Sequence, residues 1–597
     1  GGIPASVGAN YAIQVGDIVT TGGSNGSGSI SIATATPSLA TPVVITNGAI
    51  SSGSFGTGTI QATNVFTKNL ISDGGLISLD VGANLLAFGD ISSVGQGAGA
   101  GGTVSIKTGS NTALTVGSSF NNLNGVSGVI NRGISGGAAA SAILNSATGG
   151  ITISDAADIQ AFAGAGAGGS LTLLSSGGTV SIPSLSRDAV GAGNFKGGSI
   201  LIDSLSLVST DPASLRLVAT GVNGGAGGTV SVRTSSYAGA TPTLLFSASG
   251  GANGSGGRVD SKLLFNSSLD LNLHANGLGS GKGGDIVVDF GGFATQAGSQ
   301  LIASAIGGNT GGGGTILISN ASGISGALLA NADAGSAGAG AGGSATLAVD
   351  GDIQAAGTSL RLSAVGGDAG SGGSVGLRAN DITAQSVLLQ ASAGANGGNG
   401  GSIDYFIRSV DSSTFNAIAS APNGNGGRIG SLSAPLPVPA IITGNFTQGF
   451  GVANFIATGG LKGGQVNLQF GNDVTGTALF VDTQSGSGNG GGATVAVGGQ
   501  LSTSNVSVNT NGANDAGALN LTITGARTGS STVLSANGVA GKGGAVTYSS
   551  ASVSSPIEFR ASADGGNSGG TASVTTGALR ADLTSLTANS SAGTGGS

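Results

Sequence analysis

A short phrase recurs along the chain, and it constrains the fold more than any other feature. Each copy has two glycines, one small or polar residue, and then a run in which apolar residues alternate with other types. One copy ends in Gly102-Thr103-Val104-Ser105-Ile106, and others lie at residues 198–202, 228–232, 314–318, 373–377, 464–468 and 544–548. A unit that returns at a fixed period predicts a repeat architecture, in which each unit stacks on its neighbours.

The period of this phrase predicts the kind of repeat. Its second glycine returns every 26–30 residues from Gly169 to Gly427, and one longer step of 37 residues leads to Gly464. Inside a period the apolar residues are spaced by two, which is typical of β-strands, and each period holds about three short strands. This matches one coil of a parallel β-helix. We therefore predict an all-β chain, a right-handed parallel β-helix or β-solenoid with about 26–30 residues per coil.

The regularity of the repeat suggests how the chain is organised. Residues 101–597 keep the period and are expected to form one regular Gly-rich solenoid, whereas residues 1–100 fit it loosely and are predicted to be less regular coils or a cap. The long step contains three prolines within residues 433–440. Proline cannot donate a hydrogen bond to a strand ladder, so we expect a Pro-rich insertion there.

The alternation also predicts which side chains face the interior. In one strand, Leu215, Leu217 and Ala219 are expected inside, with Arg216 and Val218 outside. Other strands fit this register, with inward residues at Leu269, Leu271, Leu273, Ala275, Leu360, Leu362, Ala364, Ile557, Phe559 and Ala561. The glycines that follow such strands are expected to permit positive φ at tight corners.

Composition excludes other folds and several classes of partner. Glycine makes up 121 of 597 residues, but it is not found at every third position as collagen requires, and each period carries large aliphatic residues that a disordered chain would lack. Only 8% of the residues are charged, the net charge is −7 and there is no basic patch, so we expect no nucleic-acid partner. The longest apolar runs are too short for a membrane span, and we expect none.

The ends of the chain and its surface composition bear on assembly and location. Methionine is absent, which predicts that the chain is processed or is a segment of a longer one. Neither end shows a polar cap, so we expect self-association end to end into a filament. The outer surface is rich in Ser, Thr, Asn and Gly, as is common on exported bacterial fibres, and this favours an extracellular or cell-surface location.

The sequence predicts no catalytic, cofactor-binding or metal site. His274 is the only histidine, and it falls between inward Leu273 and Ala275, so it should point outward without the partners of a triad or a zinc site.

Acidic residues give no clearer signal. Asp285 and Asp289 share one outward face, as do Asp270 and Asn272, but neither set recurs on adjacent coils in a way that would build a groove. The simpler interpretation is that such residues bond nearby backbone in turns. The glycine clusters also lack the ligand aspartate of the calcium-binding nonapeptide, so no calcium is expected.

Four of the seven lysines precede the glycine pair: Lys196, Lys282, Lys462 and Lys542. The favoured interpretation is a solvated charge that discourages unwanted edge pairing. The alternative is a contact row for a neighbouring rod or an acidic glycan.

The two-glycine phrase and the apolar strand that ends in alanine resemble the repeats of filamentous-haemagglutinin-like exoproteins, which are long right-handed β-helices exported to bacterial surfaces. The resemblance covers roughly residues 100–597. It implies a surface filament or adhesin without catalysis. The secretion domain of that family carries Asn-Pro-Asn motifs, and this chain has no Asn-Pro pair.

Two classes of function follow. The first is an extracellular structural protein that forms a β-solenoid rod or surface filament in adhesion, biofilm or cell-surface coating, with surface glycans or neighbouring cells as further partners. The alternative is a β-helix lyase or glycosidase that acts on polysaccharide. Such an enzyme needs clustered acids with a Lys, Arg or His partner, which the sequence does not display, so we expect no enzyme and favour the first class.

Overall fold

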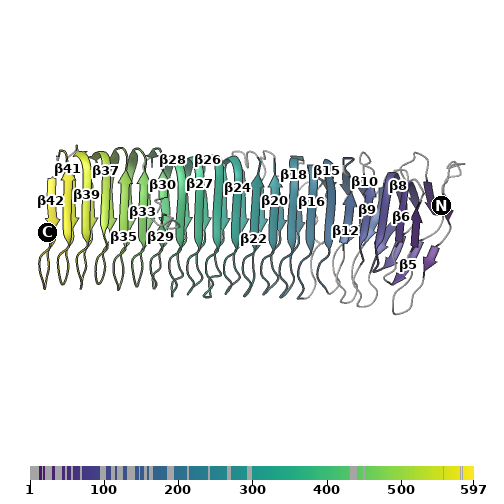
Figure 1. Cartoon of the computed structure of the whole chain (residues 1–597), viewed down its shortest axis with the longest axis horizontal. Coiled ribbons are helices and arrows are strands. Elements are labelled where there is room, and N and C mark those ends of the chain that lie inside the picture. Colours follow the sequence, from purple (N-terminus) through teal and green to yellow (C-terminus); the bar gives the residue numbers. More distant parts are fainter. Residues whose placement is uncertain are drawn as a thin grey trace. The chain divides into compact units, whose positions relative to one another are not determined.

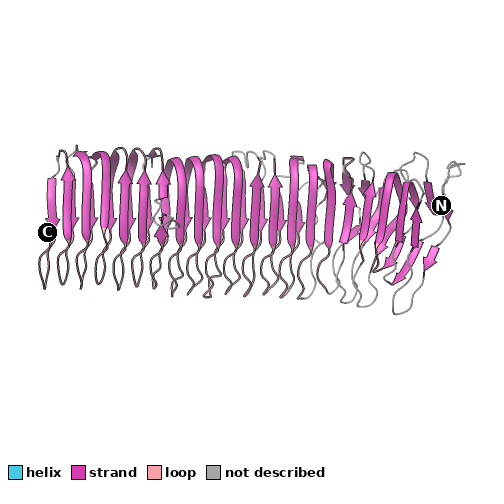
Figure 2. Cartoon of the chain, viewed as in Figure 1, coloured by secondary structure: helices cyan, strands magenta, loops and turns pink. Residues whose placement is uncertain are grey.

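The structure of the chain is a computed structural model in which strands and loops account for all described residues. It describes residues 13–15, 18–20, 30–33, 43–46, 50–54, 58–67, 70–94, 102–108, 114–116, 125–130, 141–146, 148–153, 158–160, 166–183, 194–210, 214–238, 243–264, 270–291, 299–430, 440–447, 451–554, 557–578, 580 and 582–597. Every regular element in these ranges is a β-strand and none is a helix (Figure 2). The predicted all-β class is confirmed.

By its contacts the chain falls into two compact units. Unit 1 comprises Gly1–Leu278 and Val287–Gly291, and unit 2 comprises Gly279–Ile286 and Gly292–Ser597. The strands of unit 1 are β1 (Ile13–Val15), β2 (Ile18–Thr20), β3 (Ile30–Ala33), β4 (Val43–Thr46), β5 (Ile50–Ser54), β6 (Gly58–Thr67), β7 (Leu70–Asp73), β8 (Ile77–Ser93), β9 (Val104–Thr108), β10 (Leu114–Val116), β11 (Gly125–Ile130), β12 (Ser141–Asn145), β13 (Ile151–Ile153), β14 (Asp158–Gln160), β15 (Ser170–Ile182), β16 (Ser199–Ser209), β17 (Leu215–Val218), β18 (Thr229–Ala238), β19 (Thr243–Ser247), β20 (Arg258–Leu263) and β21 (Asp270–His274). Strand β22 (Asp285–Phe290) holds residues of both units. The strands of unit 2 are β23 (Gln300–Ser304), β24 (Thr315–Ser325), β25 (Ala327–Asn331), β26 (Ser344–Ser363), β27 (Ser374–Gln390), β28 (Ser402–Ile418), β29 (Arg428–Ile429), β30 (Ala440–Ile442), β31 (Phe446–Thr447), β32 (Val452–Ile456), β33 (Gln465–Phe470), β34 (Val474–Asp482), β35 (Gly492–Val497), β36 (Leu501–Asn509), β37 (Leu519–Thr528), β38 (Ser531–Ser535), β39 (Ala545–Val553), β40 (Glu558–Ser562), β41 (Thr571–Thr576) and β42 (Asp582–Thr587).

Strands of successive coils pair in parallel and in register. In unit 2, Ser344 of β26 pairs with Ser374 of β27, which pairs with Ser402 of β28. In unit 1, Ser170 of β15 pairs with Ser199 of β16. The sequence spacing of these partners equals the period of the two-glycine phrase, and Figure 1 shows the strands of each unit side by side. The predicted parallel β-solenoid with this coil length is confirmed.

In the coil that contains β27, two of the three corners need no loop. Along β27, buried and outward residues alternate, except at Asn380–Asp381 and at Gln385–Ser386, where two neighbours in sequence both lie outside. We call each of these two points a slip. The strand turns a corner of the coil there, while its hydrogen bonds to the neighbouring coils continue. The three short strands expected in a period are thus joined in this coil into one strand of 17 residues, and the glycine-rich segment forms the remaining corner.

The interior follows the predicted register. Leu215, Leu217 and Ala219 are fully buried and Arg216 is exposed, as expected, but Val218 is only 9% exposed and so is buried instead of outside. Val218 is the last residue of β17, where regular alternation stops as the chain enters the glycine-rich corner. The other expected inward residues that are described are buried too: Leu271, Leu273, Ala275, Leu360, Leu362, Ala364, Ile557, Phe559 and Ala561. Leu269 lies outside the described residues.

The recurring glycine pair is required by close packing of backbones. A Cβ atom on Gly401 would lie 1.9 Å from the carbonyl oxygen of Gly373 in the preceding coil, and the same contact recurs between Gly373 and Gly343. None of these three glycines has a positive φ. The expectation that the glycine clusters serve positive φ is therefore wrong for the pair itself, although Gly398 in the adjoining loop does have a φ of 80°.

Side chains at the same corner link the coils of unit 2 through hydrogen bonds to backbone. The Asn511 Oδ1 atom accepts the backbone N–H of Asn537 at 2.6 Å, Asn537 Oδ1 accepts that of Asp564 at 2.8 Å, and Asp564 Oδ1 accepts that of Asn589 at 2.7 Å. We call these four residues the corner ladder. It satisfies polar backbone where the strand pairing ends.

Arg527 is a fully buried cation in the interior of unit 2. Its guanidinium donates hydrogen bonds to the backbone carbonyls of Leu501, Thr503, Thr528 and Ser531. Its Nε atom also donates to the hydroxyl of Thr532. Burial lowers its pKa to about 10. The carbonyl dipoles thus stabilise a charge that would otherwise be costly to bury.

The coil length changes in two places. In unit 1, Gly58 of β6 pairs with Ile77 of β8, so this coil is much shorter than the regular period. In unit 2, Ile429 of β29 pairs with Ile403 of β28, and Ile441 of β30 pairs with Phe406 of the same strand. The chain from Ile429 to Ile441 is longer than the chain from Ile403 to Phe406, so this coil contains an insertion between the two paired positions. The predicted Pro-rich insertion falls at this point, but residues 433–439 lie outside the described part.

Candidate functional site

His274 lies where the sequence predicts. It is the outward, half-buried last residue of β21, and burial lowers its pKa below 6.5. Its Nδ1 atom is 3.5 Å from Asn276 Nδ2. Across the described residues, no three or more His, Cys, Asp or Glu side chains lie close enough together to hold a metal ion. Those residues also include no helix with the length and apolar character needed to cross a membrane.

The acidic pairs singled out in the sequence lie at outward positions. Asp270 and Asn272 alternate with buried residues on β21, and Asp285 and Asp289 do so on β22. Asp289 lies 3.7 Å from the Nζ atom of Lys262. Their surroundings are those of ordinary surface groups.

The four lysines before the glycine pairs are all exposed. In unit 2, Lys462 borders a shallow groove of about 580 Å³ with a glycine floor, along which Arg428, Asn425, Ser402 and Gln465 also lie. This position fits a solvated charge, and it also leaves the alternative contact role open.

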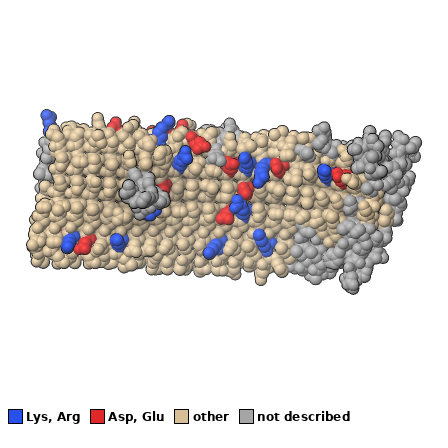
Figure 3. All heavy atoms as spheres, viewed as in Figure 1, with Lys and Arg blue, Asp and Glu red and all other residues tan. Residues whose placement is uncertain are grey.

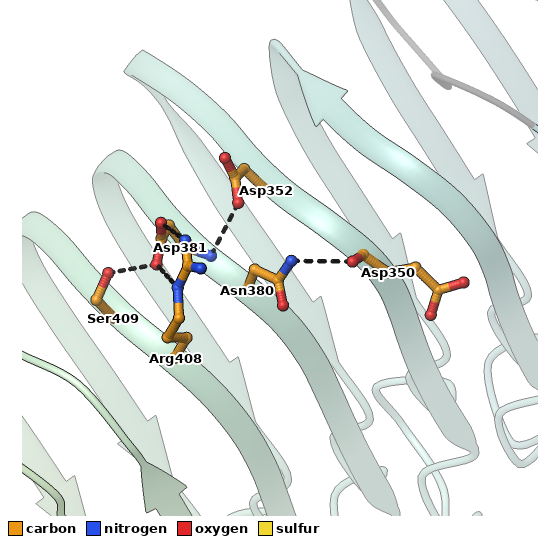
Figure 4. A network of polar contacts seen from close by, with 6 residues as sticks. All are labelled: Asp350, Asp352, Asn380, Asp381, Arg408 and Ser409. Carbon is orange, nitrogen blue, oxygen red and sulfur yellow. Dashed lines mark hydrogen bonds and ion pairs between the residues drawn. The ribbon is translucent and has the colours of Figure 1, made fainter.

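A network of polar contacts joins three coils of unit 2 at a corner (Figure 4). Arg408 donates from Nε to Asp381 Oδ1 at 2.8 Å and forms an ion pair with the same carboxylate, to which Ser409 also donates at 2.5 Å. The hydrogen bond from Arg408 lowers the pKa of Asp381. Asn380 donates to the backbone oxygen of Asp350, and the N–H of Asp381 to Asp352 Oδ1. The carboxylate of Asp381 is thus saturated with partners within the protein, as in a structural link.

Charged side chains are sparse on the surface. Figure 3 shows them singly or in small opposite-charge groups, separated by wide areas of uncharged residues, on the face drawn. An interaction of this face with a partner would therefore depend mainly on shape, hydroxyl groups and local apolar patches.

One depression combines those features. A pocket of about 330 Å³ lies on the outer face of β26, β27 and β28, and its outward lining is formed by Thr346, Ala348, Gly376, Arg378, Asp404, Phe406 and Ile441. We call it the β27 pocket. Two rows of paired residues cross it: Thr346–Gly376–Asp404, and Ala348–Arg378–Phe406–Ile441. Gly376 leaves a gap in the first row, and the pocket opens there.

The polar and aromatic groups around this gap have few internal partners. Asp404 is half-buried, and its Oδ1 atom has no hydrogen-bond partner among the described residues. Burial raises the pKa of Asp404, and the nearby charge of Arg428 opposes this shift only in part. Phe406 is 50% exposed. A half-buried carboxylate with one buried, unpartnered oxygen and an exposed aromatic ring, both in the lining of one pocket, are features of a binding site.

Sequence reasoning did not single out Gly376, Asp404 or Phe406. The signal was present, because Gly376 stands three residues after Gly373 in the repeated phrase, where the neighbouring copies have Thr346 and Asp404. Aligning copies of the phrase would have placed these residues in one row.

Comparisons with models of protein families, with curated proteins and with solved structures give no match for this chain.

Proposed function

We propose that the chain is an extracellular structural protein, a β-solenoid that contributes to a cell-surface filament or coating and to adhesion or biofilm. The observation that carries the proposal is the in-register parallel stacking of coils, with backbone groups satisfied from coil to coil and side-chain links such as the corner ladder. Such stacking gives a stiff, repetitive scaffold. The likeness to filamentous-haemagglutinin-like repeats supports the same conclusion.

Self-association belongs to this proposal. Each coil pairs on both sides through the same parallel edges, as β27 does with β26 and β28. A coil of a second copy can use an edge in the same way, and a head-to-tail contact of this kind does not close, so it extends into a filament. Surface glycans or neighbouring cells are the further partners.

The rival function is a polysaccharide lyase or glycosidase. The raised pKa of Asp404 is the observation that favours it, because a general acid needs a protonated carboxyl. However, glycoside hydrolysis ordinarily uses two carboxyl groups, and Asp404 is the only one among the residues that line the β27 pocket. We therefore favour a binding role over a catalytic one.

Three measurements test the proposal. Light scattering and negative-stain images over a concentration series should show filaments that lengthen with concentration, whereas single chains at every concentration would contradict the filament. Surfaces coated with the folded protein should retain more cells than surfaces coated with the heat-denatured protein. Release of reducing ends or unsaturated sugars from a panel of polysaccharides would support the rival enzyme.

A further inference from the structure

We propose that the β27 pocket binds one ring of a neutral hexose in a surface oligosaccharide. This inference names the ligand class for the adhesive part of the proposed function and rests on that function. It stands on three features of the pocket: the gap at Gly376, the unpartnered oxygen of Asp404 and the exposed ring of Phe406.

Glycine at position 376 is not the residue that stability alone would favour inside a strand. Gly376 lies inside β27, between paired Thr346 and Asp404, and its φ is not positive. The nearest atoms that a Cβ there would meet belong to the Thr346 side chain, at 3.3 Å or more, and a small movement of that side chain relieves the contact. Glycine within a strand is destabilising relative to alanine. A glycine that no backbone contact demands is typical of a place where a ligand approaches closely.

The size of the gap suits a single sugar ring. Thr346 and Asp404 lie two strand spacings apart, about 9.6 Å from backbone to backbone. With no side chain at Gly376, the opening between the Thr346 and Asp404 side chains is narrower than this backbone spacing, and it suits a pyranose ring held on edge against the sheet. Phe406 follows Asp404 by two residues on the same face of β28, so its ring borders the opening. The apolar C–H face of a hexose packs well on an aromatic surface.

The polar groups favour hydroxyls over charged ligands. Asp404 Oδ1 is buried and has no donor among the described residues, so a turn of the half-buried carboxylate toward the opening would let a sugar hydroxyl donate to it. An unsatisfied buried oxygen is destabilising, and a ligand that donates to it removes that cost. Arg378 lies beside Gly376 in the lining and can donate to ring or hydroxyl oxygens. Because Arg378 and Asp404 carry opposite charges, the lining has little net charge, and neutral hexoses fit it better than uronic acids.

The experiment uses the full chain and a panel of oligomers of glucose, galactose and mannose, with an oligomer of a uronic acid and a phenylalanine-containing peptide as competing ligand classes. Saturation-transfer NMR and titration calorimetry measure binding. We expect at least one neutral oligomer to bind with a Kd on the order of 1 mM, as is reasonable for one exposed subsite. Phe406→Ser and Asp404→Ala should each weaken it at least tenfold.

The sharpest variant is Gly376→Val, which fills the gap without removing any polar group. We expect it to abolish detectable binding while the melting temperature stays equal or rises, since valine suits a strand better than glycine. The matched controls are Phe480→Ser, an exposed phenylalanine outside the pocket, and Asp411→Ala, an exposed acid on β28. Both should leave the Kd within twofold of the wild-type value.

The following results would overturn the proposal: no neutral oligomer binds, only the uronic acid oligomer or the peptide binds, or Gly376→Val binds as well as wild type. Its failure can be told apart from failure of the proposed function. Cells retained on coated surfaces without any hexose binding would overturn the pocket alone. Hexose binding by a protein that neither forms filaments nor retains cells would contradict the proposed function alone.

Discussion

Replacing Phe415 by alanine should open the interior of unit 2 locally. Phe415 is fully buried and its ring is the hub of an aromatic cluster, with ring centroids 5.7 Å from Tyr405, 5.4 Å from Phe446 and 5.6 Å from Phe455. A Phe→Ala change in a core costs about 3–5 kcal/mol, because the lost contacts leave a cavity that the surroundings fill only in part. Since three rings lose contact with the hub, we expect a value toward the upper end.

The loss should be confined to neighbouring coils. In a solenoid each coil contacts only its neighbours, so a global melting curve is a poor reporter and local hydrogen exchange is a better one. Every 1.4 kcal/mol is a factor of ten, so amide protection in β28 and β32 should fall by about a hundredfold to a few thousandfold. Protection in β39–β41 should change little.

The matched control is Phe480→Ala, because Phe480 is 37% exposed on the outer face of β34. A surface substitution of this kind typically changes stability by no more than about 0.5 kcal/mol. Equal losses in Phe415→Ala and Phe480→Ala would refute the assignment of inner and outer faces. A loss spread evenly to β41 would refute the nearest-neighbour picture.

Three further predictions concern polar groups. Arg527→Met leaves buried carbonyls without their donor, so it should lower the stability of unit 2 by about 1–3 kcal/mol or more. Local hydrogen exchange measures this loss. Asn537→Ala should cost about 1 kcal/mol and raise exchange at the backbone N–H of Asp564, whereas exposed Asn567→Ala should not. Burial lowers the pKa of His274 below 6.5, so the unfolded chain binds this proton more tightly. The stability that neutral His274 contributes to unit 1 should therefore be complete above pH 6.5 and should fall as the pH drops toward the folded-state pKa of this histidine. NMR titration of the single histidine should give a pKa below 6.5, and a value at or above 6.5 would contradict its burial.

Much of the fold could be predicted because the sequence repeats a physical constraint. Leu360, Leu362 and Ala364 alternate with outward residues and are all fully buried, since a stacked coil offers one narrow interior. The corners were harder to predict. The slip at Asn380–Asp381 uses residue types that are common in turns, so the sequence predicts separate short strands where the structure has one continuous strand. The reason for the glycine pair was also missed, because contact between backbones of adjacent coils depends on spacing across the stack.

The candidate site was hidden for a related reason. Alternation along one strand shows that Asp404 and Phe406 both face outward, but it does not say what lies beside them. Only the register between β27 and β28 brings Gly376 next to Asp404, and a shift of one residue would separate them. The missing hydrogen-bond donor for Asp404 is a three-dimensional fact that no pattern along a single coil contains.

The stacking of coils restricts where a selective binding site can form on this surface. Equivalent outward positions of adjacent coils lie about 4.8 Å apart, so a charge repeated in every coil would repel its copies. The 8% charged content and the pairing of Arg408 with Asp381 fit this restriction. A regular row therefore offers a uniform, nearly neutral surface with little selectivity. Selectivity needs a position where one coil differs from its neighbours, as Gly376 differs from Thr346 and Asp404, and such departures are where binding on this chain should be sought.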